Sequence, residues 1–225
     1  MSHELRTPLT FIGGYLELLQ DGDAGEVLPE QAQMLEIIER NTIRLGGLIE
    51  DILVLNRIET GRLQLTIEHA SVRELMTHTA EELQPLADRA GVVMDIDAGP
   101  ASAIVDGDRG HLQRAIVNIL SNAIKFSPRG GKVSLSCSLD GETVKIVCSD
   151  HGIGIPAADM NQMFSRFFRA SNASAQAIPG TGLGLAIVKM IVENHGGTLD
   201  LQSVEGEGTT ITLEFPLSDS ALPTG

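Results

Sequence analysis

The sequence predicts an α+β protein, in which a helical hairpin at the N-terminus is followed by an α/β sandwich. Apolar residues recur every three or four positions in the first part of the chain. In several short segments of the second part they alternate with polar residues, which is typical of strands. Because the period changes near residue 63, we expect one domain at 1–62, a second at 63–218 and a frayed tail at 219–225.

The charge and the apolar pattern exclude several classes of function. A formal net charge of −14 over 225 residues has the wrong sign for a protein that neutralises nucleic-acid phosphates. No stretch approaches the run of apolar residues that a membrane span needs, and the N-terminus lacks the pattern of a signal peptide. We therefore expect a soluble chain that makes no membrane contact itself and has no nucleic-acid partner.

The N-terminal segment carries a histidine at the start of an expected helix. One apolar seam of this helix consists of Leu5, Leu9, Ile12, Leu16 and Leu19. His3 lies off the seam and faces water, and Thr7, four residues later, shares its face. Pro8 has no N–H to donate to the Glu4 carbonyl, so we expect a bend that exposes His3. An accessible imidazole beside a carboxylate is typical of a nucleophile with a neighbouring base, whereas the alternative is a solvated surface histidine.

A second helix is predicted from about Pro29 to Thr60, with Gly61 as its stop. Its apolar seam consists of Ile38, Leu45, Leu48, Ile52 and Leu55. Two helices alone cannot shield both seams from water, so the simplest solution is a second copy of the hairpin. We therefore expect a homodimer in which two hairpins form a four-helix bundle.

The second domain is expected to combine short strands with helices. Strands are predicted at 63–67, 92–96, 104–105, 198–203 and 209–215, with a hairpin at 132–150. Helices are predicted from a capping box at 71–74 to about 91, at 108–126 and from 184 to about 195. Since antiparallel strands with helices between them form a sheet covered on one face, we expect an α/β sandwich.

The two cysteines lie in the arms of the expected hairpin. If residues 140–141 form a two-residue turn, Cys137 faces Val144 and Cys148 faces Val133. We expect buried, reduced thiols rather than a disulfide or half of a metal site.

Four stretches of the second domain carry chemistry, and the first lies on the helix at 108–126. Asn118 and Asn122 are four residues apart and Lys125 follows three later, so the three side chains share one helical face. Amide oxygens can complete a magnesium shell together with phosphates and water, and an ammonium group can neutralise a phosphate. The alternative is an ordinary polar helix face.

The second stretch, DHGIGIP, begins at Asp150 and directly follows an expected strand. Its glycines allow the backbone to approach a planar ligand, and Asp150 can accept a hydrogen bond from an exocyclic amine. Alone, this pattern is equally typical of a turn.

The third stretch, MFSRFFR, begins at Met163 and precedes a segment at 170–176 that is poor in large apolar residues. We interpret it as a hinged lid anchored by aromatic side chains. The alternative is a surface loop whose phenylalanines fill the core.

The fourth stretch, GTGLGL, runs from Gly180 to Leu185 and opens the last expected helix. Backbone N–H groups at a glycine-rich helix start form an anion site that suits phosphates. The spacing differs from a P-loop, and a loop precedes the motif where a Rossmann fingerprint would follow a strand.

In this order and at these separations, the four stretches resemble the N, G1, F and G2 boxes of two-component sensor histidine kinases. SHELRTPLT resembles the phospho-acceptor box of the same family, and FIGGYLELL is similar to its phosphate-regulon subgroup. The resemblance covers nearly the whole chain. It implies a HisKA hairpin and an ATP-binding domain of the GHKL superfamily, with ATP and Mg²⁺ as cofactors. It also implies autophosphorylation on His3 and transfer to an aspartate of a response regulator.

The resemblance also implies roles for individual residues. His3 is similar to the phosphorylated residue, Glu4 to the base that helps it attack, and Thr7 to the residue that positions water when a partner is dephosphorylated. Asn122 resembles the magnesium ligand, and Asn118 the residue near the metal or the acceptor histidine. The remaining expected nucleotide contacts are Lys125 at the phosphates, Phe126 beside the nucleotide, Asp150 at the adenine, Arg166 or Arg169 at the γ-phosphate, and Gly152, Ile153, Gly154, Gly180, Thr181, Gly182, Leu183, Gly184 and Leu185 in the pocket and lid.

Related ATPases of the gyrase, Hsp90 and MutL type share this pocket, so hydrolysis must be weighed against transfer. Those enzymes place a glutamate four residues before the magnesium asparagine, where it activates water. Here that position is Asn118, and an amide cannot act as a general base near neutral pH. Transfer to His3 is therefore favoured.

The chain starts two residues before His3, where family members have more helix. We accordingly expect the cytoplasmic core of a larger sensor, which could be anchored in the inner membrane. The alternative is a non-catalytic, dimeric nucleotide-binding module from a truncated sensor.

Overall fold

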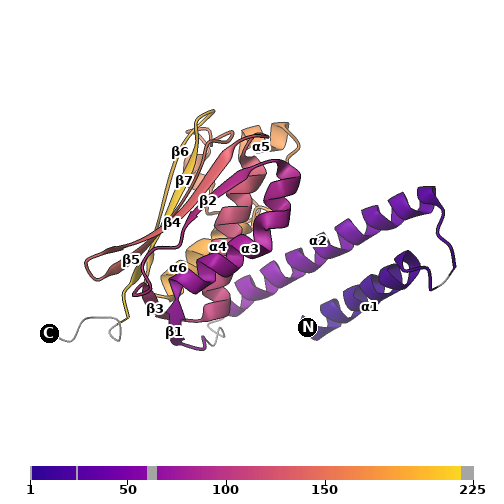
Figure 1. Cartoon of the computed structure of the whole chain (residues 1–225), viewed down its shortest axis with the longest axis horizontal. Coiled ribbons are helices and arrows are strands. Elements are labelled where there is room, and N and C mark those ends of the chain that lie inside the picture. Colours follow the sequence, from indigo (N-terminus) through magenta and orange to yellow (C-terminus); the bar gives the residue numbers. More distant parts are fainter. Residues whose placement is uncertain (1, 24, 60–64, 219–225) are drawn as a thin grey trace. The chain divides into compact units, whose positions relative to one another are not determined.

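The computed structural model describes residues 2–23, 25–59 and 65–218, and the chain divides into two compact units. The first unit comprises Met1–Leu63 and the second Gln64–Gly225. Figure 1 shows that the first is helical and that the second combines a sheet with helices. The α+β fold class is therefore confirmed.

The first unit is a hairpin of α1 (Ser2–Gln20) and α2 (Pro29–Glu59), which run side by side in Figure 1. α1 continues through Pro8, and α2 begins at a proline, whose missing N–H would have no helical acceptor in the first turn. Gln20 ties the two helices together, since its Nε2 donates to Glu39 Oε2 over 3.0 Å. The predicted stop at Gly61 lies outside the described residues.

The second unit contains a mixed sheet with the strand order β2-β4-β5-β7-β6. β2 runs parallel to β4, and the other neighbours are antiparallel. Its strands are β2 (Val93–Asp97), β4 (Lys132–Asp140), β5 (Thr143–Asp150), β6 (Thr198–Val204) and β7 (Gly208–Pro216). A separate two-stranded sheet pairs β1 (Glu68–Ser71) with β3 (Ile104–Gly107). The strand predicted at 63–67 is thus wrong, because the described residues 65–67 have no strand structure and pairing begins at Glu68.

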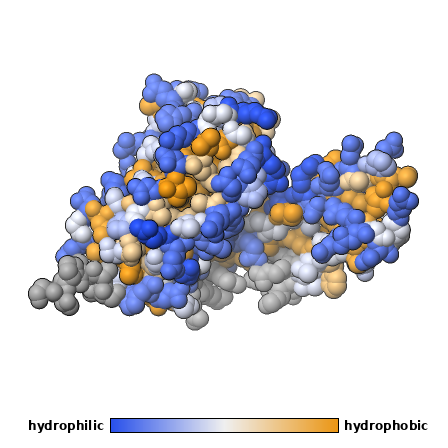
Figure 2. All heavy atoms as spheres, viewed as in Figure 1, coloured by the Kyte–Doolittle hydropathy of each residue, from blue (hydrophilic) through white to orange (hydrophobic). Residues whose placement is uncertain are grey.

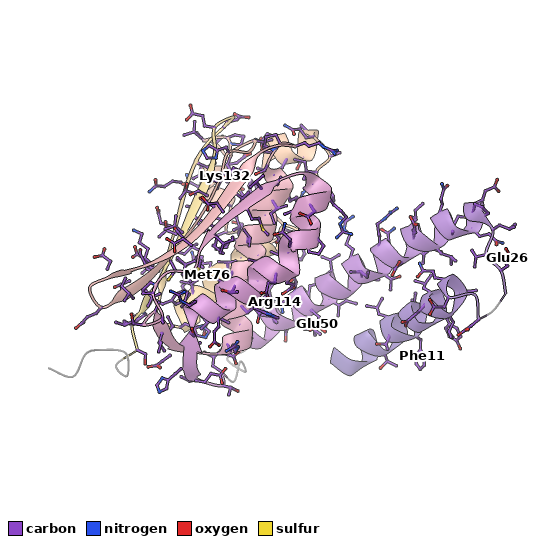
Figure 3. The ribbon with its side chains drawn as sticks, viewed as in Figure 1. Phe11, Glu26, Glu50, Met76, Arg114 and Lys132 are labelled. Carbon is purple, nitrogen blue, oxygen red and sulfur yellow. The ribbon has the colours of Figure 1, made fainter. Side chains whose placement is uncertain are left out.

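Long helices lie on one side of the five-stranded sheet in Figure 1, which makes the second unit an α/β sandwich. They are α3 (Val72–Ala90), α4 (Arg109–Phe126) and α6 (Gly184–Asn194). Short helices η1 (Met160–Gln162) and α5 (Ser171–Ala175) precede α6. Met76 of α3, labelled in Figure 3, is 0% exposed. The largest buried side chains, which include Leu75, Ile116, Ile119, Leu135, Ile146, Ile187 and Phe215, come from both layers and form the core.

α3 begins within the predicted capping box and ends at the predicted Gly91, and Asp108, the predicted start of the next helix, caps α4. Ser71 Oγ accepts from the Glu74 N–H over 3.4 Å at the start of α3, and Gly91 adopts a left-handed conformation (φ 67°) at its end. Asp108 Oδ1 accepts from the His111 N–H over 3.0 Å at the start of α4. These caps fix where each helix meets the sheet.

The β4–β5 hairpin has a different register from the one predicted. Asp140 pairs with Thr143, so the two-residue turn is 141–142 rather than 140–141. Cys137 consequently faces Ile146, and Cys148 faces Leu135. Both thiols are buried and free, as expected, and burial raises the pKa of Cys137 to about 11. Burial likewise raises the pKa of Cys148.

Candidate nucleotide site

The asparagines of α4 lie against the start of α6. Asn118 and Asn122 are half-buried, and Asn118 Nδ2 donates to the Arg114 carbonyl over 3.1 Å. A Cβ built on Gly184, the first residue of α6, would lie 3.0 Å from Asn118 Oδ1 and 3.8 Å from Asn122 Nδ2. A side chain at position 184 would therefore fill the space beside both amides. The fold brings the first and fourth sequence motifs together.

Two cations converge beside the glycine-rich loop that precedes α6. A Cβ on Gly180 would lie 2.8 Å from Lys125 Nζ and 3.9 Å from Arg169 Nε. The ammonium group also lies 4.5 Å from the centroid of the Phe126 ring, and the Arg169 guanidinium donates to the Ile178 carbonyl. Since the backbone approaches both cations here, this end of the site suits an anion such as a phosphate.

Asp150 ends β5 and begins a loop that closes against the end of α4. The Gly152 N–H donates to Asp150 Oδ1 over 2.8 Å, and the Ile153 N–H donates to the Phe126 carbonyl over 3.2 Å. A Cβ on Gly152 would clash with the Phe126 carbonyl oxygen, so the position requires glycine.

Burial raises the pKa of Asp150 above its usual range, although hydrogen bonds from the Gly152 and Thr209 N–H groups and the nearby His151 act in the opposite direction. Asp150 is therefore a partly desolvated carboxylate at the end of a strand. A half-buried acid whose pKa is raised in this way is typical of a ligand-binding site.

The loop after Asp150 is hydrogen-bonded to the end of β6 and to the β6–β7 turn. The Ile155 N–H donates to Ser203 Oγ over 2.9 Å, and the Gly206 N–H donates to the Ile153 carbonyl over 2.9 Å. Gly154 packs so closely against the Val204 carbonyl that a side chain at 154 would clash with it. Ser203 was not predicted from the sequence, because its partner lies 48 positions away and no local pattern marks the residue.

The aromatic residues of the third motif have divided roles. Met163 packs with Phe126 and Ile153 around a small cluster of buried residues formed by Ile155, Ala170 and Ala173. Phe164 and Phe168 are half-buried, whereas Phe167 is 63% exposed and has a positive φ of 61°, which is strained for a residue with a side chain. Neither anchoring nor core filling therefore describes all three rings.

The two arginines of this motif also differ. Arg169 is half-buried and lies beside Gly180, whereas Arg166 is exposed. Of the two candidates for a phosphate contact, the fold brings Arg169 to the glycine-rich loop.

The glycine-rich loop is shaped by its own side chains and by the third motif. The Leu183 N–H donates to Thr181 Oγ1 over 3.2 Å, and Gly182 has a φ of 72° where it meets the backbone of Phe167 and Phe168. Leu183 is 0% exposed, whereas Leu185 is half-buried. The Leu183 side chain thus anchors the loop in the core.

The predicted acceptor residues belong to the first unit. His3 and Glu4 lie in the first turn of α1, and their side chains are outside the described residues. Thr7 is exposed on the same helix.

The described residues lack one kind of side-chain group that binds metal ions in proteins. They contain no group of three or more His, Cys, Asp or Glu side chains that could hold a metal ion. Among the described helices, none has the length and hydropathy of a membrane span.

Two family models match the chain. The His Kinase A (phospho-acceptor) domain matches residues 1–61. The model of histidine kinase-, DNA gyrase B- and HSP90-like ATPases matches residues 107–219. The acceptor box lies within the first match, and all four motifs of the candidate site lie within the second.

Curated relatives are similar over almost the whole chain. Sensor histidine kinase WalK of Bacillus subtilis is 35% identical over 97% of this chain and 36% of its own length. The circadian input-output histidine kinase CikA of Thermosynechococcus vestitus is 37% identical over 99% of this chain and 31% of its own length. Sensor-like histidine kinase SenX3 of Mycobacterium tuberculosis is 36% identical over 96% of this chain and 52% of its own length. The chain therefore spans between about a third and a half of the length of these three relatives.

Solved structures agree with these matches. Full-length ShkA in complex with AMPPNP is 26% identical with a TM-score of 0.77, over 98% of this chain and 46% of that chain. The histidine kinase AdeS of Acinetobacter baumannii is 25% identical with a TM-score of 0.68, over 96% of this chain and 98% of that chain.

Proposed function

The chain belongs to the two-component sensor histidine kinases, and from that premise we propose that it uses ATP to phosphorylate His3. The phosphoryl group then passes to an aspartate of a response regulator. The observation that carries the proposal is the convergence of Asn118, Asn122 and Lys125 on the glycine-rich loop that opens α6.

The nucleotide is oriented by the two ends of the site. Asp150 accepts a hydrogen bond from the exocyclic amine of adenine, Phe126 packs beside the base, and the backbone of Gly152, Ile153 and Gly154 shapes this end. Lys125 and Arg169 neutralise the phosphates. The backbone from Gly180 to Leu185 supplies N–H groups for the same phosphates, because the loop opens α6.

Asn122 fits a role as a magnesium ligand, because its half-buried amide lies beside Gly184 and an amide oxygen can complete a magnesium shell. Since the described residues offer no acidic cluster, the ion would arrive with the nucleotide and take its other ligands from phosphate and water. Bound Mg²⁺ would neutralise charge on the phosphates.

In the transfer step, a neutral imidazole nitrogen of His3 attacks the γ-phosphorus of ATP. A P–N bond forms, the bond to the bridging oxygen breaks, and ADP leaves with the electron pair. Glu4 accepts the proton that the other ring nitrogen releases. Asn118 cannot deprotonate water, so hydrolysis does not compete through that residue.

The functional protein is proposed to be a homodimer. On α2, Ile38, Leu45 and Ile52 are 47%, 48% and 47% exposed, so one hairpin leaves much of its apolar seam uncovered, although Leu55 is buried. A second hairpin would cover it as a four-helix bundle. We place this part of the protein in the cytoplasm, where ATP and response regulators are found. Thr7 would serve a phosphatase activity toward the same partner.

Transfer of label from γ-labelled ATP to the purified chain tests the proposal. We expect acid-labile label on the wild-type chain and none on His3→Gln, while His78→Gln, which changes an exposed histidine of α3, keeps it. Label retained by His3→Gln would contradict the assignment. ATP binding without any label would favour the non-catalytic module, and steady phosphate release by His3→Gln would favour a conformational ATPase.

A further inference from the structure

The segment between the third and fourth motifs is not an unattached loop. It contains α5, and the residue at the start of this helix is held by a carboxylate from the preceding turn. Asp159 Oδ2 accepts from the Ser171 N–H over 2.7 Å and from Ser171 Oγ over 2.8 Å. Hydrogen bonds from Ser171 lower the pKa of Asp159, so the carboxylate is ionised at neutral pH. One side of the lid segment therefore has a fixed attachment.

A second attachment runs from α5 to the loop that follows Asp150. Asn172 Nδ2 lies 3.0 Å from the Gly154 carbonyl oxygen and 3.3 Å from that of Ile153. At the other end of the same amide, Oδ1 accepts from the Ala173 N–H over 2.8 Å. The side chain is half-buried and uses both its donor and its acceptor. Replacing it would leave a gap between the lid and this loop.

The two carbonyls that Asn172 contacts belong to a loop that is otherwise closely fitted. Ile153 donates to Phe126 on one side and accepts from Gly206 on the other. Gly154 leaves no space for a side chain against Val204. Backbone hydrogen bonds thus hold the loop to α4 and to the β6–β7 turn. The Asn172 side chain holds the same loop to the lid.

We propose that Asn172 is a positioning residue that couples the lid to the adenine-binding loop. It lies outside the four sequence motifs, and its donor joins two parts of the proposed site that are 18 positions apart in the chain. When Asn172 holds the Ile153 and Gly154 carbonyls, the loop that presents Asp150 and the lid that reaches Gly180 are ordered together before nucleotide arrives. Loss of the donor makes the nucleotide order them, which weakens binding. This inference rests on the proposed function.

Three variants separate this role from a general loss of stability. Asn172→Asp keeps an acceptor for the Ala173 N–H but replaces the donor with a carboxylate that repels the two carbonyls. Asn172→Ala removes the donor and the acceptor, and with them all three hydrogen bonds. Asn194→Asp is the matched control, because Asn194 Nδ2 also donates to a backbone carbonyl, that of Met190 over 2.7 Å, at the exposed end of α6.

We would measure the Kd for ATP, the rate of His3 labelling against ATP concentration, and amide exchange without nucleotide. Both Asn172 variants should raise Kd and KM about five- to tenfold, with the labelling rate at saturating ATP within about twofold of wild type. Amides of residues 151–155 and of α5 should exchange faster in both variants, and Asn194→Asp should match wild type.

An unchanged Kd in both Asn172 variants would overturn the inference. So would a loss of affinity accompanied by a fall in unfolding temperature and faster exchange throughout the second unit, because that result describes general destabilisation. A wild-type chain that binds no ATP would instead refute the proposed function. The exchange comparison would still decide whether Asn172 joins the two segments.

Discussion

Asp150 combines two requirements that oppose each other at the scale of one side chain. Its position at the end of β5 removes water from the carboxylate, and this burial raises its pKa. Between the usual and the raised pKa, the folded chain binds more protons than the unfolded chain, so this group makes folding less favourable as pH rises through that window. The ionised group is nevertheless the form that can accept a hydrogen bond from an adenine amine.

We predict that Asp150→Asn separates these effects. The unfolding temperature at neutral pH should be equal to or above that of wild type, because the amide avoids the cost of a buried charge. ATP affinity should fall at least about tenfold, since the amide loses the charged acceptor. In wild type, affinity should decrease as pH falls through the raised pKa. Calorimetric titration and thermal unfolding measure both, and unchanged affinity in the Asp150→Asn variant would contradict the adenine contact.

Thr79 offers a second test at this scale, away from the site. Its side chain is 0% exposed on α3, and Oγ1 has no hydrogen-bond partner among the residues that the structure describes. Thr79→Val removes the buried hydroxyl at nearly constant volume. We expect about 1 kcal/mol of added stability and an unfolding temperature higher by about 2–4 °C.

The matched control for Thr79→Val is Thr77→Val, on the exposed side of the same helix. Thr77 is exposed, and its Oγ1 donates to the Arg73 carbonyl over 2.9 Å. Thermal unfolding of the two variants should give a higher midpoint only for the change at 79. A lower midpoint there would mean that the hydroxyl makes a stabilising contact.

The limits of sequence reasoning are clearest for individual residues. The motifs at Asn118, Asp150 and Gly180 are local, so their spacing predicts which side chains share a face or a loop. Asn172 and Ser203 act on partners that are distant in the chain, and a single asparagine or serine has no periodic signature.

The same limit applies to elements. The hairpin at 132–150 was predicted correctly from its alternation, but its register was wrong because Asp140 stays paired and Gly141, with a φ of 59°, enters the turn first. The segment at 170–176 was interpreted as part of a hinged lid, and no helix was predicted within it. Asp159 and Asn172 stabilise the short helix α5 there by hydrogen bonds, which hydrophobic patterning does not register.

At the scale of elements, the start of α4 is hydrogen-bonded to several other parts of the second unit through Asp108. The Asp108 carboxylate accepts from the His111 N–H over 3.0 Å and from the Thr66 N–H over 3.1 Å. The Asp108 N–H donates to His195 Nε2 over 3.0 Å, and His195 Nδ1 lies 2.7 Å from the Ile191 carbonyl at the end of α6. One residue therefore joins the start of α4, the end of α6 and the first described segment of the second unit.

Asp108→Ala should consequently destabilise the second unit by about 1–2 kcal/mol, as expected for loss of an N-cap. Burial of Asp108 opposes ionisation, but the N–H donors of His111 and Thr66 and the His111 ring outweigh it and lower the pKa of Asp108. Its contribution is therefore present above the usual aspartate pKa and is lost as pH falls through the lowered pKa.

Denaturant unfolding at neutral and acidic pH would measure this loss. Asp88→Ala provides a control, because Asp88 is exposed and its carboxylate accepts from the neighbouring Gln84 side chain. The difference between Asp108→Ala and wild type should shrink at acidic pH, whereas the control should stay near wild type. A difference that is independent of pH would show that the carboxylate charge is irrelevant.

At the scale of the whole molecule, the two units differ in how far they bury their apolar side chains. The second unit buries its largest ones between sheet and helices. The first leaves many in contact with water, including Phe11 at 64%, Met34 at 63% and Ile43 at 68% exposed. Phe11 projects from α1 in Figure 3, and Figure 2 shows hydrophobic residues on the surface of the hairpin. A surface of this kind is typical of an interface.

We therefore predict that the chain is a dimer of about twice 24.0 kDa and that two added charges on α2 dissociate it. Ile38→Glu with Leu45→Glu would place carboxylates in the uncovered seam, where pairing would bury them at a cost of several kcal/mol. Light scattering should give a monomer, while ATP affinity stays within about twofold of wild type, because the nucleotide site lies in the other unit. Gln33→Glu with Arg40→Glu adds the same number of carboxylates at exposed polar positions and should remain dimeric. A seam variant that stays dimeric would show that the hairpins do not associate through this face.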